Sequence, residues 1–145
     1  MSRADVAALR FVHPDLDAGT SSHVGLGTDA VGRLAVAVGD DVVRQSILML
    51  ISTSPGERVM RPGYGCPLNR LVFQPLDNTT AGLAIHYVER AVRRWEPRAE
   101  VLKVDAYPTP HRESSLTVEL HYRVRSSQRE HELQLEMSMS GGTLQ

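Results

Sequence analysis

Three carboxylates in the loop-rich middle of the chain are the residues best placed for chemistry: Glu57, Asp77 and Glu96. Glycan hydrolysis needs two carboxyl groups across the scissile bond, one of them with a raised pKa. Glu57 and Glu96 each have an arginine close by in sequence, Arg58 and Arg98. A neighbouring guanidinium lowers the pKa of a carboxyl group. The arginines therefore argue against a general acid.

The segment Glu96-Pro97-Arg98 places an acid and a base on either side of a rigid proline. Since the residue before a proline disfavours the helical conformation, a helix that reaches Glu96 ends there. Arg98 has the geometry to hold a partner carboxylate through two parallel hydrogen bonds, and Glu96 can accept from a partner arginine. The alternative is that the proline only ends the helix, and that the two charges are solvated or pair with each other.

The segment from 55 to 67 is rich in proline and glycine. Its Pro-Gly pair predicts a tight turn that presents Glu57 and Arg58 together; the alternative is an ordinary surface ion pair, which stabilises little. Tyr64 lies between two glycines, which permit unusual backbone angles, and is a candidate aromatic anchor. We favour burial of Tyr64 in its own domain over burial in a partner, and we interpret Cys66 as a small apolar residue.

The histidines and the single cysteine give no metal-binding pattern. His111, His121 and His131 lack ligand spacing, and the last two fall on different faces of their predicted strands. One cysteine excludes an intrachain disulfide and a cysteine cluster for zinc. The sequence also lacks a Gly-rich phosphate loop, Gly-x-Ser-x-Gly and His-Glu-x-x-His. We therefore expect no catalytic residue, no metal and no cofactor.

Charge and hydropathy argue against two classes of partner. The 145 residues carry a formal net charge of -1, so no long-range field draws the chain to nucleic acid or to an anionic membrane. No apolar run approaches the roughly 18 residues that span a bilayer, and no signal peptide is apparent. With one cysteine, this fits a reducing cytoplasm. Lys103 is the only lysine, and arginine, which supplies the rest of the positive charge, suits protein interfaces.

Two amphipathic helices must position the charged segments. Asp40 or Asp41 can cap the first helix, which begins near Val42, and one of residues 77–79 can cap the second, which runs to about Trp95. A short helical turn is expected between them, around 68–71. The apolar residues that recur at the helical period are Val43, Ile47, Leu50 and Ile51 in the first helix, and Ala81, Ala84, Ile85, Val88, Ala91, Val92 and Trp95 in the second.

Alternation of apolar and polar residues predicts strands in the C-terminal third. Residues 116–124 and 131–139 alternate with period two, which gives one buried and one wet face, and a turn at 126–129 joins them as a hairpin. Further strands are expected at 101–107 and 33–38. We predict an α+β fold, a single small domain over residues 31–145 with two main helices packed on a mostly antiparallel sheet that ends in a C-terminal β-hairpin. Residues 1–30 lack a core-forming period and are predicted to be an N-terminal arm that partners order.

Several of these motifs follow one another in a fixed order and spacing along the chain. The string from Ile51 to Arg58 is followed by Met60 to Gly65, then by Leu68, Leu71, Phe73 and Pro75, and a helix ends in Glu96-Pro97-Arg98 before a strand. In this combination the chain, over Gly32 to Met137, resembles the baseplate wedge family of contractile phage tails, type VI secretion baseplates and extracellular phage-tail-like injection particles.

The resemblance implies a structural subunit in a sixfold baseplate around the tail tube. Its partners would be other baseplate wedge proteins and the sheath protein, with tube or hub proteins as further candidates. Such a particle assembles in the cytoplasm. The residues that we expect to bind partners in the loops are Glu57, Arg58, Tyr64, Glu96, Pro97 and Arg98.

The last strand is a second candidate contact. At least one edge of so small a sheet stays open, and open edges invite strand addition. The resemblance implies that sheath subunits link by exchanging strands, so a wedge protein that presents such an edge could template the first sheath ring. We expect this contact at Leu133, Gln134, Leu135 and Glu136.

Two alternatives remain open at this point. Some members of the resembling family have carried a lysozyme label, so a peptidoglycan-cleaving glycan hydrolase of a tail baseplate is the first. A free peptide-binding module is the second. Clearing of peptidoglycan by the purified chain would favour the hydrolase, whereas stable behaviour only beside wedge partners would argue against the free module.

Overall fold

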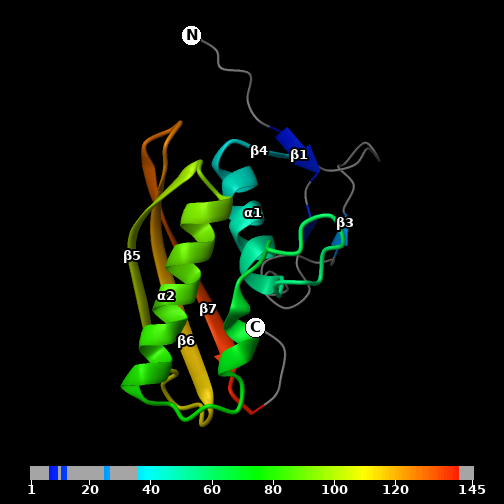
Figure 1. Cartoon of the computed structure of the whole chain (residues 1–145). Coiled ribbons are helices and arrows are strands. Elements are labelled where there is room, and N and C mark those ends of the chain that lie inside the picture. Colours follow the sequence, from blue (N-terminus) through cyan, green and yellow to red (C-terminus); the bar gives the residue numbers. More distant parts are fainter. Residues whose placement is uncertain (1–6, 10, 13–24, 27–35, 141–145) are drawn as a thin grey trace.

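A three-stranded antiparallel sheet forms the back of the molecule (Figure 1). The computed structural model describes residues 7–9, 11–12, 25–26 and 36–140, with side chains described from 38 onward. The sheet order is β5 (Ala99–Pro108), β6 (Ser115–Val124), β7 (Arg129–Ser138), so neighbours in sequence are neighbours in space. Two helices, α1 (Asp40–Ser52) and α2 (Asn78–Trp95), lie in front of it, and a short 3-10 helix, η1 (Pro67–Leu71), connects them. The predicted α+β fold and its hairpin are confirmed.

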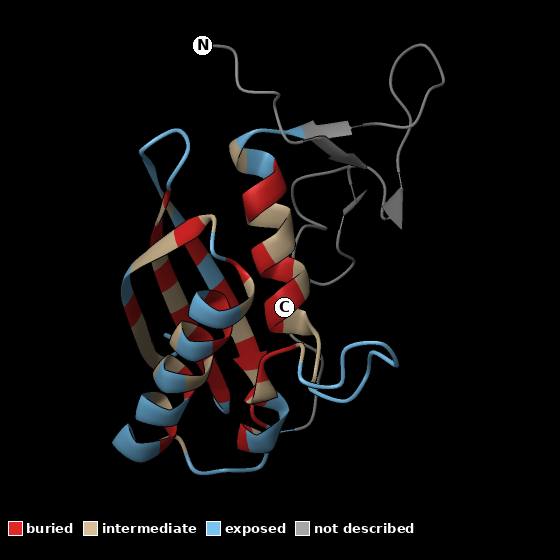
Figure 2. Ribbon diagram, turned by 45° about the horizontal axis from the view of Figure 1, so that its top comes forward, coloured by how far each residue is buried: buried red, intermediate tan, exposed pale blue. Residues whose placement is uncertain are grey.

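The period-two residues of β6 and β7 form the floor of the core (Figure 2). α2 packs along β5 and also contacts α1 and η1, which closes the core from the front. Because one face of the sheet is covered and the other is wet, alternate side chains of β7 are buried and accessible. The apolar strand residues buried in this core are Ala99, Val104, Leu116, Val118, Leu120, Tyr122, Val124, Leu133, Leu135 and Met137.

The two helix starts differ in how they are capped. Asp77 precedes α2, and its Oδ1 accepts a hydrogen bond from the Thr80 backbone N–H at 2.8 Å, as predicted. The predicted aspartate cap of α1 is wrong: the helix already begins at Asp40, and its N-cap is Gly39, which makes no side-chain cap. The Asp40 carboxylate instead lies 2.7 Å from Nε2 of His131 on β7. The carboxylate therefore contacts a residue 91 positions away in sequence instead of capping the helix.

The remaining boundaries lie within two residues of their predicted positions where the structure describes them. The strand expected at 101–107 extends to Ala99–Pro108 and carries a bulge between Val101 and Lys103. The strand expected at 33–38 is described as β4 (Val36–Val38), and 33–35 lie outside the described residues. The turn expected at 68–71 is η1.

Short strands also occur in the segment predicted to be an arm. β1 (Ala7–Leu9) pairs antiparallel with β4, and β2 (Phe11–Val12) pairs with β3 (Gly25–Leu26). The rest of residues 1–30 lies outside the described residues. Ordering of this arm by partners stays a prediction. Among the described helices, none has both the length and the apolarity to cross a membrane.

Candidate partner-binding site

The acid and the base of the Glu96-Pro97-Arg98 segment pair with each other. Arg98 donates from Nε to Oε1 of Glu96 at 2.7 Å and from Nη2 to Oε2 at 2.8 Å, a bidentate geometry. Nη2 of Arg98 also donates to Oγ of Ser46 on α1, at 3.0 Å. The hydrogen bond to Glu96 raises the pKa of Arg98. Glu96 and Arg98 therefore pair with each other, which was one of the two possibilities that the sequence left open.

This pair, which we call the corner, ties three elements together. Glu96 is the C-cap of α2 and is 4% exposed, Arg98 directly precedes β5, and Ser46 belongs to α1. The far end of the hairpin joins the corner, since Arg125 donates from its backbone N–H to Arg98 O at 2.9 Å and from Nε to Pro97 O at 3.0 Å. Both carboxylate oxygens of Glu96 are bound inside the fold. The side chain of Arg98 stays 40% exposed, so it is the charged group of the corner that a partner can reach.

The loop from 55 to 63 begins with a type II turn. The Glu57 backbone N–H donates to Ser54 O at 3.1 Å, and Gly56 between them has a φ of 94°. Gly56 N–H also donates to Pro62 O at 2.8 Å, which closes the base of the loop. The tight turn predicted from Pro-Gly is confirmed. The loop projects from the body beside α1, and the side chains of Glu57 and Arg58 are exposed (Figure 2).

Tyr64 connects this loop to the end of α2. Its ring meets that of Trp95 edge-on, with centroids 5.5 Å apart, and the Arg58 guanidinium lies 4.4 Å above it. Tyr64 is half-buried in its own domain, as predicted, and Trp95 is the residue before Glu96. The loop and the corner are thus neighbours on one surface.

Gly65 fixes where the loop leaves the body. Its φ is 131°, and a Cβ at this position would lie 2.9 Å from Pro55 N and would clash with Thr53 O. The next residue, Cys66, donates its backbone N–H to the same Thr53 O at 2.8 Å. Cys66 is 1% exposed, and burial raises the pKa of its thiol to about 12, so it behaves as the apolar residue predicted.

The tip of the loop carries two apolar side chains that sequence reasoning missed. Val59 is 94% exposed and Met60 is 90% exposed. Large apolar groups held in water on a braced loop mark interaction surfaces. The available signal was an apolar pair between Arg58 and Arg61 inside a Pro/Gly-rich segment.

The strand β7 lies at an edge of the sheet, as the sequence led us to expect of the last strand. Within the described residues its only strand partner is β6. The Met139 N–H donates to Ser114 O, which fixes the hydrogen-bonding pattern between the two strands. Because this pattern alternates along an antiparallel pair, the backbone groups of Leu133 and Leu135 bond to β6. The backbone N–H and C=O groups of Gln134 and of its even-numbered neighbours point outward.

The four predicted contact residues of β7 therefore divide into two pairs. The side chains of Leu133 and Leu135 are in the core, 4% and 3% exposed, and are out of reach of a partner. Gln134 is exposed, and Glu136 pairs with Arg112 at 3.0 Å. Only the outward backbone and the wet-face side chains can meet another chain.

Three wet-face residues gather potential metal-ligand atoms: Glu119, His121 and Glu132. The register that sets His121 opposite Glu132 brings them together, which histidine spacing alone did not reveal. Glu119 already accepts hydrogen bonds from Tyr107 and Gln134. All three side chains are accessible to water. Charged side chains that face one another across neighbouring strands on a wet face account for this cluster.

Residues 37–129 match the model of a family described as baseplate wedge protein gp25. The baseplate wedge protein gp25 of Enterobacteria phage T4 is 33% identical to this chain over 82 residues. That match covers 57% of this chain and 61% of the phage protein, so the chain spans less than two thirds of this relative.

Two solved structures share the fold. A Geobacter sulfurreducens protein, described as a candidate tail lysozyme, is 36% identical with a TM-score of 0.65, covering 72% of this chain and 94% of that one. A chain of the anti-feeding prophage baseplate is 25% identical with a TM-score of 0.64, covering 68% and 79%. The matched residues contain both helices, the loop, the corner and most of the sheet. This protein belongs to the gp25 baseplate wedge protein family.

Proposed function

We propose that this protein is a structural subunit of the baseplate of a contractile injection machine, where it binds neighbouring wedge proteins and supports the first sheath ring. The observation that carries the proposal is the family match over residues 37–129, which includes the loop and the corner but only the first residue of β7, Arg129. Assembly in the cytoplasm into a sixfold phage-tail-like particle, with tube or hub proteins nearby, belongs to the same proposal.

The corner and the loop together supply a surface suited to wedge partners. The exposed part of Arg98, the exposed ring of Pro97 and the braced loop with Val59 and Met60 adjoin through Tyr64 and Trp95. Interfaces combine apolar anchors with arginines in this way. Co-purification of the tagged full chain with its particle tests the role: stoichiometric recovery with wedge and sheath proteins is expected, and recovery of the chain alone from cells that assemble particles would contradict it.

The outward edge of β7 is the proposed template for sheath. Backbone groups of Glu132, Gln134 and Glu136 would pair with a strand of the first sheath subunit. Gln134→Pro removes an outward N–H and leaves the backbone hydrogen bonds to β6 in place, although the side-chain bond to Glu119 is lost. We expect baseplates and tubes without full-length sheath in electron micrographs. Leu135→Pro breaks the β6–β7 ladder and is the control for misfolding, whereas intact sheaths on Gln134→Pro particles would exclude this edge.

A peptidoglycan hydrolase is the second candidate, because the Geobacter sulfurreducens relative is described as a candidate tail lysozyme. Its chemistry needs a carboxyl group free to protonate the glycosidic oxygen. Both oxygens of Glu96 are occupied by Arg98, and Glu57 stands on an exposed turn. A zymogram of the purified chain should show no clearing. Clearing that disappears in Glu57→Gln would establish the hydrolase instead.

A further inference from the structure

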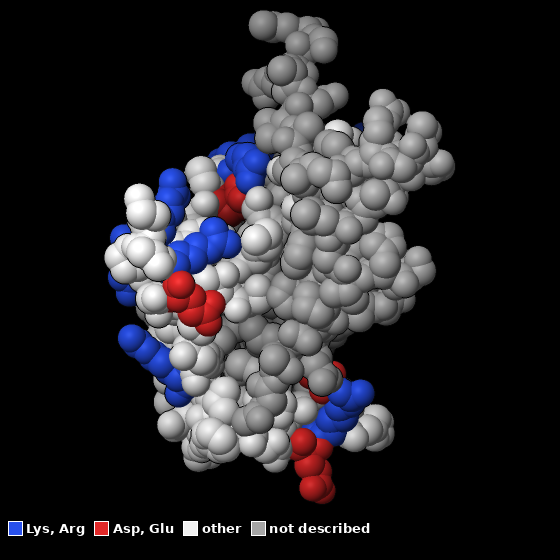
Figure 3. Space-filling view, turned by 90° about the vertical axis from the view of Figure 1, so that its right-hand side faces the viewer, with Lys and Arg blue, Asp and Glu red and all other residues white. Residues whose placement is uncertain are grey.

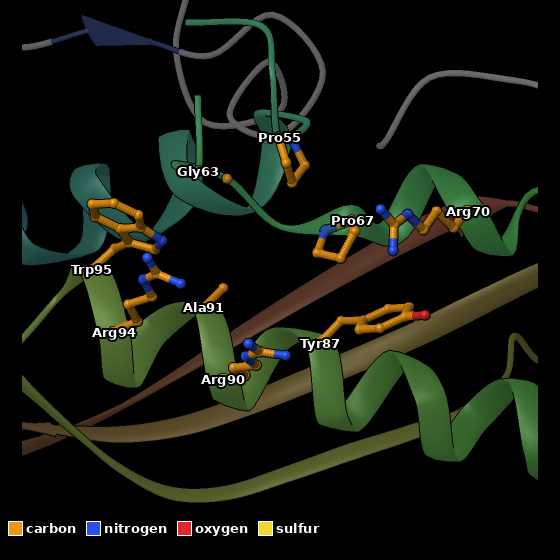
Figure 4. Close-up of a pocket in the computed structure, with 10 residues that line it drawn as sticks. Pro55, Gly63, Pro67, Arg70, Tyr87, Arg90, Ala91, Arg94 and Trp95 are labelled. Carbon is orange, nitrogen blue, oxygen red and sulfur yellow. The ribbon is translucent and has the colours of Figure 1, made fainter. Parts of the chain in front are cut away.

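A small groove opens between the outer face of α2 and the segment that leads from the loop into η1 (Figure 4). Ala91 and the rings of Trp95 and Tyr87 line it from α2, and Pro55 and Pro67 line it from the opposite side. Its volume is about 180 Å³. That is below the roughly 300–1,000 Å³ typical of small-molecule sites, so the groove suits one or two side chains of another protein.

Three guanidiniums surround this apolar groove. Arg90 and Arg94 lie one turn apart on α2, and Arg70 comes from η1 (Figure 4). Among the residues that the structure describes, none of the three has a carboxylate within ion-pair distance, whereas Arg93 on the same helix is paired with Glu89 at 2.7 Å. The groove thus presents apolar walls and unneutralised positive charge.

The aromatic and charge pattern disfavours nucleic acid as the occupant. Single-stranded nucleic acid is held by basic grooves whose aromatic rings have a free face for stacking. The Trp95 ring is covered by Tyr64 and by Arg94, whose guanidinium lies 4.9 Å from it. Figure 3 shows acidic side chains interspersed among the basic ones on the face it displays. The formal net charge of -1 also gives no overall positive field that would draw nucleic acid to the groove.

We infer that this groove binds an acidic segment of a neighbouring baseplate protein, with one apolar side chain between the groove walls and flanking carboxylates on Arg70, Arg90 and Arg94. Arginine holds carboxylates through two parallel hydrogen bonds. Charge complementarity of this kind sets specificity and association rate. The inference deepens the proposed function and rests on it only for the origin of the segment.

The test uses the full chain and a defined probe. A fluorescein-labelled octapeptide of glutamates that flank Leu-Phe is titrated by anisotropy against its glutamine-substituted twin. We expect the acidic peptide to bind the unmodified chain saturably. The glutamine peptide should bind the unmodified chain at least tenfold more weakly, and the acidic peptide should bind the Arg94→Glu variant at least tenfold more weakly. Arg129→Glu carries the same charge change on an exposed site at the hairpin and should alter the affinity less than twofold.

The chain provides an internal reporter, since Trp95 is its only tryptophan. Its emission should change with the same midpoint as the anisotropy, because the ring lines the groove. Absence of binding, equal binding of both peptides, binding without a Trp95 response, or stronger binding of a single-stranded oligonucleotide at equal salt would each overturn the inference. Arg94→Gln replaces the glutamate variant if circular dichroism shows that the latter is unfolded. Since the isolated chain is measured, failure here is distinct from failure to join a baseplate.

Discussion

The corner and the loop are linked through the Tyr64–Trp95 contact, yet the corner and the loop tip expose opposite kinds of residue. At the corner a buried glutamate holds an arginine through two hydrogen bonds, and the polar groups are satisfied inside the molecule. At the tip, Val59 and Met60 are almost fully in water, on a loop whose backbone is fixed by turns at its base. At the corner, where the sequence suggests a partner contact, the charged groups pair inside the molecule. At the loop tip, where the sequence suggests an ordinary loop, apolar side chains are exposed.

This difference separates two meanings of a contact residue. A substitution at the corner changes the folded state as well as the surface, because Glu96 loses its partner when Arg98 is removed. A substitution at the tip changes only the surface, because Val59 and Met60 lie almost wholly in water. If a substitution at the tip prevents assembly, the tip binds a partner. If a substitution at the corner prevents assembly, either partner binding or folding has been lost.

The largest expected effect is at Gly65, where the loop leaves the body. Gly65→Ala places a Cβ against Thr53 O and forces alanine into a backbone conformation reserved for glycine. We expect the free energy of unfolding to fall by about 3 kcal/mol, the upper range for one strained residue. Urea unfolding followed by Trp95 fluorescence measures it. Gly82→Ala is the control, because a Cβ there meets nothing within 4 Å and alanine favours a helix. Equal stability of the two variants would show that the loop relaxes around the clash.

Arg98→Ala is expected to have the next largest effect. It leaves the buried carboxylate of Glu96 without its guanidinium, and an unsatisfied buried acceptor costs about 1–3 kcal/mol. Because Arg98 is 40% exposed and water can reach part of the pair, we expect a loss of about 2 kcal/mol. Urea unfolding of the isolated chain gives the value, and Arg98→Lys should recover part of it. An unchanged stability together with failed assembly would mean that the corner acts by contact alone.

Local patterns predicted the elements of this fold well, for identifiable reasons. The alternation along β6 and β7 and the Asp77 cap depend on residues a few positions apart, so the sequence displays them directly. The role of Asp40 could not be predicted in this way, because its contact with His131 joins residues 91 positions apart in sequence.

The candidate site was less predictable, because each of its features has two local solutions. An acid and a base around Pro97 satisfy a partner or each other equally well, and the fold pairs them with each other while Arg98 also contacts Ser46 on α1. The exposure of Met60 depends on the path of the loop, which follows from the close approach of Gly65 to Thr53. Leu133 and Leu135 were named as contacts because they lie on the edge strand, but their side chains face the core and their backbone groups bond to β6.

A smaller effect is expected at the N-terminal end of α1, where the Asp40 carboxylate contacts Ser127 and His131 of the hairpin. Burial raises the pKa of Asp40, but hydrogen bonds from His131 and Ser127 outweigh it and hold the folded pKa of this carboxyl group below its ordinary value. A lowered carboxyl pKa stabilises the fold above the ordinary value, and this stabilisation is lost as the pH falls through the folded pKa. We expect about 1 kcal/mol to disappear below about pH 4. Urea midpoints measured across this range should converge for the unmodified chain and Asp40→Asn, whereas Glu113→Gln, on an exposed site, should keep a constant offset.

The smallest effect on stability and the sharpest test of binding are expected at Met60. Met60→Asp adds a charge to a side chain that is 90% exposed, so the unfolding free energy should change by less than about 0.5 kcal/mol. If the tip enters an apolar site on a wedge partner, the buried carboxylate has no counter-charge, and incorporation into baseplates should fall at least tenfold. Quantitative mass spectrometry of purified particles measures incorporation. Leu102→Asp makes the same change on β5, where Leu102 is 41% exposed, and should assemble normally. If both variants assemble normally, the tip is not a contact and the corner becomes the principal candidate; if both fail, the wet face of the sheet belongs to the interface as well.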